Sequence, residues 1–115
     1  MSATLPANIT GNVFTSAVYS YGNATGNISP DISLGSIQTM TLTGNITLNA
    51  LSNVASGQTA TFVMTQDATG NRLLTSTWKF ASNVRTLSTA ANATDMISVS
   101  YIGNTYYASL IRGFQ

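Results

Sequence analysis

The sequence predicts an all-β fold, an antiparallel β-sandwich of the jelly-roll type with about seven or eight short strands. Three observations lead to this prediction. Six of the nine glycines are followed directly by asparagine, and both residues tolerate the positive φ of tight turns. The runs between these dipeptides are rich in Thr, Val, Ile and Tyr, which favour strands. Helix signals are weak, because the chain has no Glu, one Lys and no sustained apolar stripe at helical spacing.

The length of 115 residues predicts a single domain that is large enough to bury a core. The chain has no cysteine, so this core must be stable without disulfides. Within this domain we expect an N-terminal arm or extra strand over residues 1–27 and a sandwich module over residues 28–115. The N-terminus has neither a basic segment nor an apolar one, so a chain that is soluble and unprocessed is expected.

The first strands are expected on either side of a proline. Residues 13–21 have the composition of a strand. Ile28, Ile32 and Leu34 then alternate around Pro30, which places their strand at a sheet edge or makes the proline its entry residue.

The Gly44-Asn45 dipeptide is expected to connect two strands less simply. A two-residue loop would pair Leu42 with the polar Thr47, whereas a three-residue loop over 43–45 pairs Leu42 with Ile46 and restores one apolar face. We therefore expect a bulged hairpin with Asn45 at positive φ, or strands that cross between two sheets.

The middle of the chain predicts three further strands with polar connections. Residues 59–66 place Ala, Phe and Met on one face, residues 73–80 carry the only tryptophan, and a short strand is expected over 84–87. Residues 67–72 are expected to form a turn that an aspartate begins, and residues 90–95 a loop.

The last third of the chain predicts a tight β-hairpin. Apolar residues alternate on both sides of Gly103-Asn104, and a glycine in the first loop position favours a type II′ turn. A two-residue loop pairs Ile102 with Thr105, Tyr101 with Tyr106, Val99 with Ala108 and Ile97 with Leu110.

Repeat architectures are not expected. The Thr-Gly-Asn triplets follow one another at intervals of 15, 18 and 26 residues, and such unequal spacing argues against a solenoid or a propeller.

The composition excludes most chemistry. There is no Cys and no His, and the acidic residues are only Asp31, Asp67 and Asp95, each in a different loop or loop edge. This inventory predicts no catalytic residue, no metal site, no cofactor and a protein that is not an enzyme. A net charge of +1 predicts no nucleic-acid partner, and no run is apolar enough to span a membrane.

The low charge points toward an assembly. Charged residues make up 6% of the chain, far below the roughly 25% of ordinary soluble domains. A surface this neutral lacks the self-repulsion that keeps a free monomer dispersed.

The aromatic residues allow two interpretations. They could form a platform that stacks on sugar rings, but core packing and subunit contact are the favoured interpretation. Tyr107 points away from Tyr106 in the expected hairpin, so one of the two faces outward. The group comprises Tyr19, Tyr21, Trp78, Tyr101, Tyr106 and Tyr107.

Several motifs between Gln38 and Leu110 resemble one known group of modules. In order along the chain they are L-T-G-N-I-T-L, Q-D-A-T-G-N-R, a strand with Trp78, A-N-A-T-D and Y-I-G-N-T-Y. Together they resemble the small Thr- and Asn-rich β-modules in virion structural proteins of tailed bacteriophages. The resemblance covers about two thirds of the chain.

The resemblance, with the short chain and its low charge, implies a non-enzymatic virion protein, assembled in the bacterial cytoplasm. We expect a homotrimeric capsid decoration, or cement, protein that binds the major capsid protein of the head. The trimer contacts are expected at Tyr101, Tyr106, Tyr107 and Leu110. The capsid contact is expected on an arm with Leu5, Ile9, Val13, Phe14, Tyr19 and Tyr21.

The alternative is a tail-fibre or spike module that recognises glycans on the host surface. Trp78 and Tyr107 are the expected glycan contacts in that case.

Overall fold

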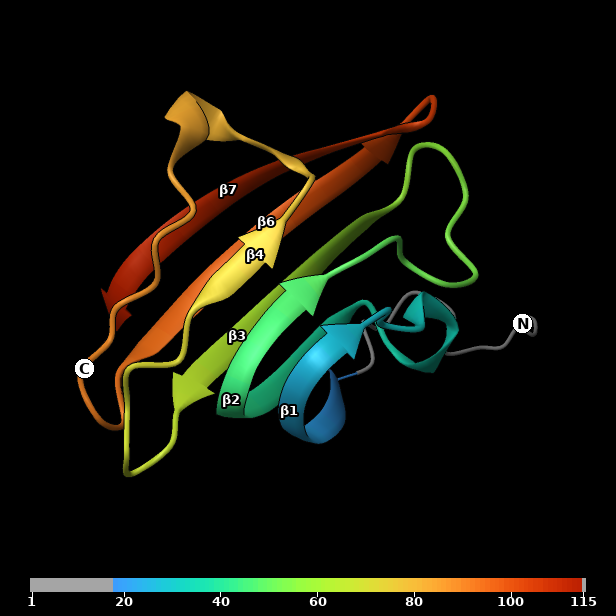
Figure 1. Ribbon diagram of the computed structural model, residues 1–115. Helices are drawn as coiled ribbons and strands as arrows, with labels where there is room; N and C mark the ends of the chain where they lie inside the picture. The colour runs from blue at the N-terminus through green and yellow to red at the C-terminus, as the bar shows by residue number, and fades with distance from the viewer. Residues whose placement is uncertain (1–17, 115) are drawn as a thin grey trace.

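The structure, a computed structural model, describes residues 18–114 and has an all-β fold, as the sequence predicts (Figure 1). Seven strands form one sheet, and two short 3-10 helices lie in the connections. Neither helix in this described part has the length and apolar character needed to cross a membrane. The elements are β1 (Val18–Ile28), η1 (Ile32–Leu34), β2 (Ile37–Leu48), β3 (Thr59–Gln66), β4 (Leu74–Ser76), β5 (Lys79–Phe80), η2 (Ala81–Asn83), β6 (Thr94–Ile102) and β7 (Thr105–Phe114).

The sheet is mixed, so the expected antiparallel jelly-roll sandwich is wrong. The strand order is β1-β2-β3-β6-β7-β5, with β4 beside β2. The pairs β1 with β2, β2 with β3, β2 with β4 and β5 with β7 are parallel, and only β3, β6 and β7 pair in antiparallel fashion. The first four strands therefore wind in one direction, as the rungs of a solenoid do.

Three of the four Thr-Gly-Asn triplets belong to the described residues and lie near bends of this coil. Thr25 of β1 lies against Gly44 of β2, where the register between the two strands shifts. Asn45 of β2 contacts the connection that follows residues 69–71, because its side-chain Oδ1 accepts a hydrogen bond from the backbone N–H of Leu73 at 3.0 Å. A solenoid is therefore compatible with the unequal spacing of the triplets, contrary to expectation, because connections of unequal length separate strands that still pair in parallel.

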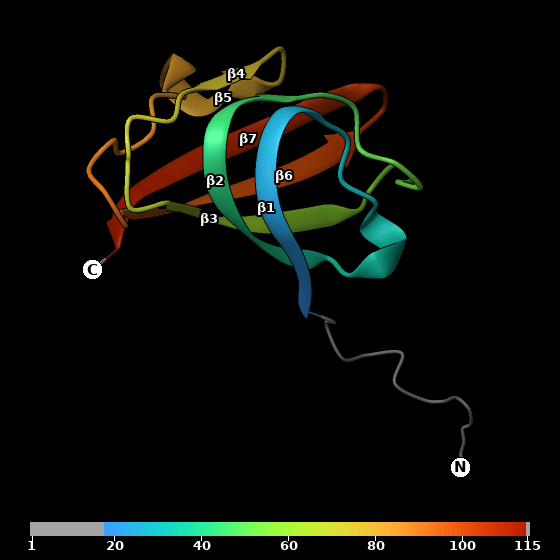
Figure 2. The ribbon, with the colours of Figure 1, turned by 60° about the horizontal axis from the view of Figure 1, so that its bottom comes forward.

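β2 turns the single sheet into two layers. Its first half pairs with β3 over residues 37–42, and its last residues, 46–48, pair with β4. Figure 2 shows β2 curving from the layer of β3, β6 and β7 up to the layer of β4 and β5. The core fills the space between the layers, with Leu42, Phe62, Met64, Trp78 and Ile97 among its most buried side chains.

Residues 43–45 form the bend of one continuous strand, and the expected hairpin there is wrong. The second alternative, a crossing between sheets, is nearer to what is seen. Gly44 and Asn45 do not have positive φ. Gly44 faces Thr25 of β1 so closely that a β-carbon would collide with the threonine side chain, so glycine is required here for space.

The N-terminal strands also differ from expectation. One strand, β1, runs through Gly22 and Gly26, whose positive φ values of 87° and 73° accompany register shifts against β2. Residues 13–17 lie outside the described part of the chain. Ile32 and Leu34 belong to η1, because Asp31 accepts from the backbone N–H of Ser33 at 2.9 Å and starts a helical turn.

The C-terminal half largely follows the prediction. β3 has the expected bounds, and β6 and β7 form the expected hairpin with every predicted pair in register. Gly103 has a φ of 63°, as the first loop position of a type II′ turn requires. The expected strand over 73–80 is divided into β4 and β5, and the strand expected over 84–87 is an irregular segment after η2.

Candidate functional site

The four aromatic and aliphatic residues predicted to form an oligomer interface lie on two sides of the β6–β7 hairpin. Tyr106 and Leu110 pack against the core, and the rings of Tyr101 and Tyr106 stand 4.6 Å apart between centroids. The Tyr106 hydroxyl oxygen also accepts from the backbone N–H of Leu51 at 3.0 Å. Tyr107 alone turns fully outward, and its side chain is 51% exposed.

Tyr107 stands on a hydroxyl-rich surface, which we call the Tyr107 face. The register aligns Thr59 of β3, Ser100 of β6 and Tyr107 of β7 in one row. The next row aligns Thr61, Ser98 and Ser109 in the same way. These side chains border a shallow hollow of about 440 Å³, and every residue that lines it is uncharged.

The alternation of the three strands creates this composition. Apolar residues such as Phe62, Ile97 and Ala108 face the core, and the intervening Ser, Thr and Tyr residues face outward. The Ser, Thr and Tyr side chains of the two rows can each offer a hydroxyl as both donor and acceptor. The Tyr107 face is therefore suited to a partner that is itself rich in hydroxyls.

Trp78 is buried, so its ring faces do not form the expected sugar-stacking platform. Its side chain is only 3% exposed. The indole lies 5.2 Å from the ring of Tyr106 and 6.5 Å from that of Phe80, both nearly parallel to it, and 6.2 Å from Phe62. Neighbouring aromatic rings thus occupy the positions where a sugar ring would stack.

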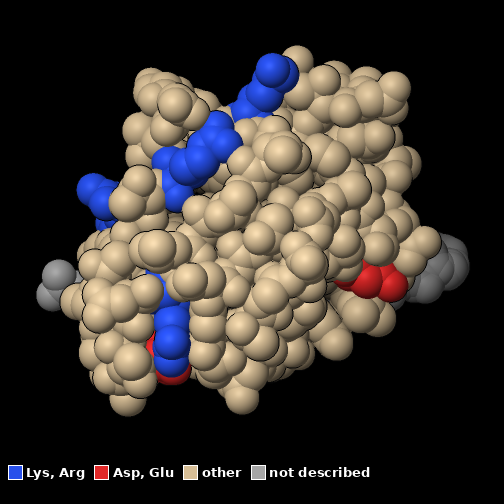
Figure 3. All heavy atoms as spheres, in the orientation of Figure 1, with Lys and Arg blue, Asp and Glu red and all other residues tan. Residues whose placement is uncertain are grey.

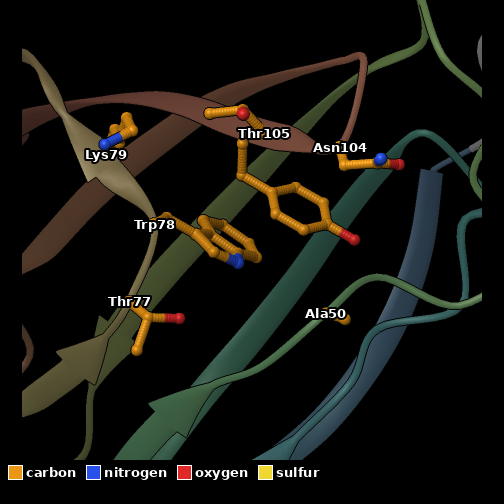
Figure 4. A pocket seen from close by; sticks show the side chains of 7 residues that line it. Ala50, Thr77, Trp78, Lys79, Asn104 and Thr105 are labelled. Carbon is orange, nitrogen blue, oxygen red and sulfur yellow. The ribbon is translucent and has the colours of Figure 1, made fainter.

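The edge of the indole borders a pocket, which we call the Trp78 pocket. It is a hollow of about 310 Å³ between the β4–β5 segment, the tip of the β6–β7 hairpin and the loop after β2 (Figure 4). Among the described residues, Nε1 of Trp78 meets no hydrogen-bond acceptor. The pocket is lined by Ala50, Thr77, Trp78, Lys79, Asn104, Thr105 and Tyr106.

Sequence reasoning named Trp78 but did not predict this pocket. The signal available was weak, a tryptophan between polar neighbours in a strand. The pocket exists because β4 ends at Ser76 and β5 begins at Lys79, so the chain departs from the sheet at Thr77 and Trp78. A short interruption of this kind depends on the loops packed around it.

The residues expected on a capsid-binding arm are only partly described. Leu5, Ile9, Val13 and Phe14 lie outside the described residues. Tyr19 and Tyr21 are half-buried on β1, an edge strand that pairs with β2, and Tyr21 packs against the core.

Each of the three aspartates accepts hydrogen bonds from backbone N–H groups of a loop. The hydrogen bond from Asn53, with those from Ser33, keeps the pKa of Asp31 below its usual range. Arg72 does the same to the pKa of Asp67 through a hydrogen-bonded ion pair of 2.8 Å. Asp95 is buried and accepts from the backbone of Ser88 and Gly113.

No three acidic side chains of the described residues come close enough to hold a metal ion.

The basic residues are distributed unevenly. Arg72 is neutralised by Asp67, while Lys79, Arg85 and Arg112 form no ion pair within residues 18–114. Figure 3 shows most of the basic side chains over the region where Figure 1 places β4 and the segment after it, away from the acidic groups in that view. This side of the molecule is therefore locally positive.

The chain matches one protein family. A family model described as "Putative phage tail fibre C-terminal domain" matches residues 28–106, which extend from the end of β1 into β7 and make up more than half of the chain. Comparison with curated proteins and with solved structures finds no match. The resemblance to virion modules of tailed phages is confirmed. The chain belongs to the phage tail fibre C-terminal domain family and is a structural component of a bacteriophage virion.

Proposed function

We propose that this chain is a non-enzymatic receptor-binding module of a tail fibre, assembled in the bacterial host cytoplasm, and that it recognises glycans on the host surface. Membership of a tail-fibre family favours this function over the capsid decoration that the short, neutral chain also allows. The observation that carries the glycan assignment is the Tyr107 face, where an exposed aromatic ring stands among hydroxyls.

The Tyr107 face suits a sugar for two physical reasons. The ring of Tyr107 can stack on the apolar C–H face of a pyranose. The hydroxyls of Thr59, Ser98 and Ser100 can exchange hydrogen bonds with sugar hydroxyls in either direction, because each is both a donor and an acceptor.

Contacts of this kind are individually weak, and the expected homotrimer would raise the avidity by presenting several copies. A non-enzymatic role is supported by the aspartates. Asp31 and Asp67 accept hydrogen bonds within two different loops, and Asp95 of β6 accepts from the backbone of Ser88 and Gly113.

The test is binding to a glycan array and to host cells. We expect saturable binding by the wild-type chain and about tenfold weaker binding by Tyr107→Ala, equivalent to about 1.4 kcal/mol. Tyr107→Phe, which keeps the ring, should retain most of the affinity. Phe114→Ala is the matched control, since it removes an exposed aromatic ring from the same strand.

Full binding by Tyr107→Ala would contradict the assignment of the Tyr107 face. The position of the protein in the virion tests the fibre role separately. Antibody labelling by electron microscopy should mark the tail fibres in a small number of copies. Labelling of the head in hundreds of copies would instead support the capsid-decoration hypothesis and its contact with the major capsid protein.

A further inference from the structure

The Trp78 pocket contains a hydrogen-bond donor that the described part of the protein leaves unused. Trp78 is almost completely buried, and its Nε1–H is without an acceptor among residues 18–114. Buried N–H groups are normally paired, since leaving one unpaired costs stability. In Figure 4 the indole nitrogen lies on the side of the ring toward Thr77 and Ala50, two exposed residues that border the same hollow.

Ligand binding at this pocket must use the edge of the indole. Tyr106 and Phe80 stack near the ring, so its faces contact protein. The indole Nε1–H can only donate, and a ligand must therefore bring an oxygen acceptor to it.

The other polar groups of the pocket also favour an acceptor. Lys79 can only donate, and the Asn104 amide and the Thr77 and Thr105 hydroxyls can donate as well. Acidic side chains are missing from the pocket lining. A negatively charged acceptor is thus met by several donors and by a positive charge.

The charge around the pocket supports the same conclusion. Lys79, Arg85 and Arg112 form no ion pair in the described range, and the basic side chains gather on the side of β4 (Figure 3). Arg85 lies 5.2 Å from the ring centroid of Phe80, the residue after Lys79. An anion that approaches this side meets a positive field.

We propose that the Trp78 pocket binds the carboxylate of an acidic saccharide, such as a uronic acid unit of a bacterial surface polymer. The carboxylate would accept from Trp78 Nε1–H. The Lys79 side chain, which Figure 4 shows on the other side of the chain from the indole nitrogen, would contribute its positive charge at longer range. The choice of a saccharide rests on the proposed function. Lys79 pairs with Tyr107 on the edge strand β5, so a polymer that passes around this edge can reach from the pocket onto the Tyr107 face.

The single tryptophan allows a direct test. A ¹⁵N-labelled chain gives one indole N–H signal in an NMR spectrum, because Trp78 is the only tryptophan. The full chain is titrated with glucuronate and galacturonate, and separately with glucose and galactose. We expect at least one uronate to move the indole signal in a saturable way, with an apparent affinity about tenfold higher than that of either neutral sugar.

Two variants locate the ligand. Ala50→Leu fills the pocket from an exposed position and should abolish the shift while the remaining signals keep their dispersion. Lys79→Met removes the charge at similar length and should lower uronate affinity to that of the neutral sugars, whereas Lys79→Arg should keep it. Arg112→Met is the matched control, because it removes a cation outside the pocket lining and should cause a smaller loss.

The outcomes separate this inference from the proposed function. If wild-type protein binds host glycans but uronates leave the indole signal unmoved, or move it equally in Ala50→Leu, the pocket assignment is overturned and the Tyr107 face still stands. Equal affinity for uronates and neutral sugars overturns the acidic ligand. If uronates move the signal while host binding survives Tyr107→Ala, the pocket stands and the Tyr107 assignment fails.

Discussion

Gly44 and Gly103 show that one dipeptide, Gly-Asn, meets two different physical demands. Gly103 supplies the positive φ of a tight turn. Gly44 has no positive φ, and it supplies space for the Thr25 side chain on the neighbouring strand. The same dipeptide occurs in both places, so the sequence predicts that glycine is required at both positions but does not distinguish a positive φ from a close contact.

Replacement of Gly44 by alanine should destabilise the fold. The new β-carbon would collide with Thr25, and overpacking of this kind costs about 1 to 3 kcal/mol. Urea unfolding would measure the loss. The double variant Gly44→Ala, Thr25→Ala removes the hydroxyl nearest to the added carbon and should recover part of it. An unchanged midpoint in Gly44→Ala would contradict the close approach.

Two buried glutamines have structural roles that composition could not reveal. Gln66 is 2% exposed, and its amide donates to the backbone carbonyls of Arg72 and Ser88 while its Oε1 accepts from Arg72 N–H. Gln38 is fully buried and donates to the carbonyls of Asp31 and Gly35. Both glutamines occupy inward positions of their strands, in phase with Met40 and Met64, and the loop carbonyls that their amides satisfy lie beyond what alternation shows.

At the scale of elements, alternation of apolar residues predicted the connection at Gly103-Asn104 correctly and the one at residues 43–45 wrongly. A two-residue loop at Gly103-Asn104 is specified by cross-strand pairing, and the register confirmed it. At residues 43–45 a three-residue hairpin and a continuous strand place Leu42 and Ile46 on the same face, because the two residues are an even number apart. Alternation alone therefore could not separate the two, and the parallel pairing of β1, β2 and β3 stayed hidden.

The loop between β3 and β4 should lose stability in acid. The pKa of Asp67 is lowered in the folded state by its hydrogen bond with Arg72, so the contribution of this pair is complete above the usual aspartate value of 3.8. It is lost as the pH falls through the lower folded value. Urea unfolding between pH 6 and pH 2 should therefore show a smaller acid loss in Asp67→Asn than in wild type.

Asp31→Asn provides the comparison at another loop. The pKa of Asp31 is also lowered, by Asn53 and Ser33, so this variant should flatten the acid profile in the same direction. Identical profiles for wild type and Asp67→Asn would show that the ion pair with Arg72 does not contribute.

At the scale of the whole molecule, Trp78 joins the two layers. It comes from the chain between β4 and β5 and contacts Phe62 of β3 and Tyr106 of β7. Removal of this side chain should loosen both layers, and Trp78→Ala is expected to cost about 3 to 5 kcal/mol. Circular dichroism during urea unfolding would report the change. Val84→Ala, at an exposed position, should stay within about 0.5 kcal/mol of wild type.

One candidate site follows from local alternation, which the sequence shows. The other depends on contacts between distant segments, which the sequence does not show. The outward direction of Tyr107 follows from alternation within one hairpin, so local sequence predicts it. The burial of Trp78 depends on β4 reaching β2 and β5 reaching β7, contacts between segments far apart in the chain. The Trp78 pocket lies where those contacts meet, and only the folded structure shows it.

The position of β2 has a consequence for synthesis. This strand hydrogen-bonds to β1, β3 and β4, and two of these partners leave the ribosome after it. Its ladder cannot be completed until residue 76 has emerged, because long-range parallel pairing must wait for the loops to close. During that interval the chain presents an open strand edge to its neighbours, and weaker expression, which lowers the concentration of unfinished chains, should therefore raise the yield of folded protein.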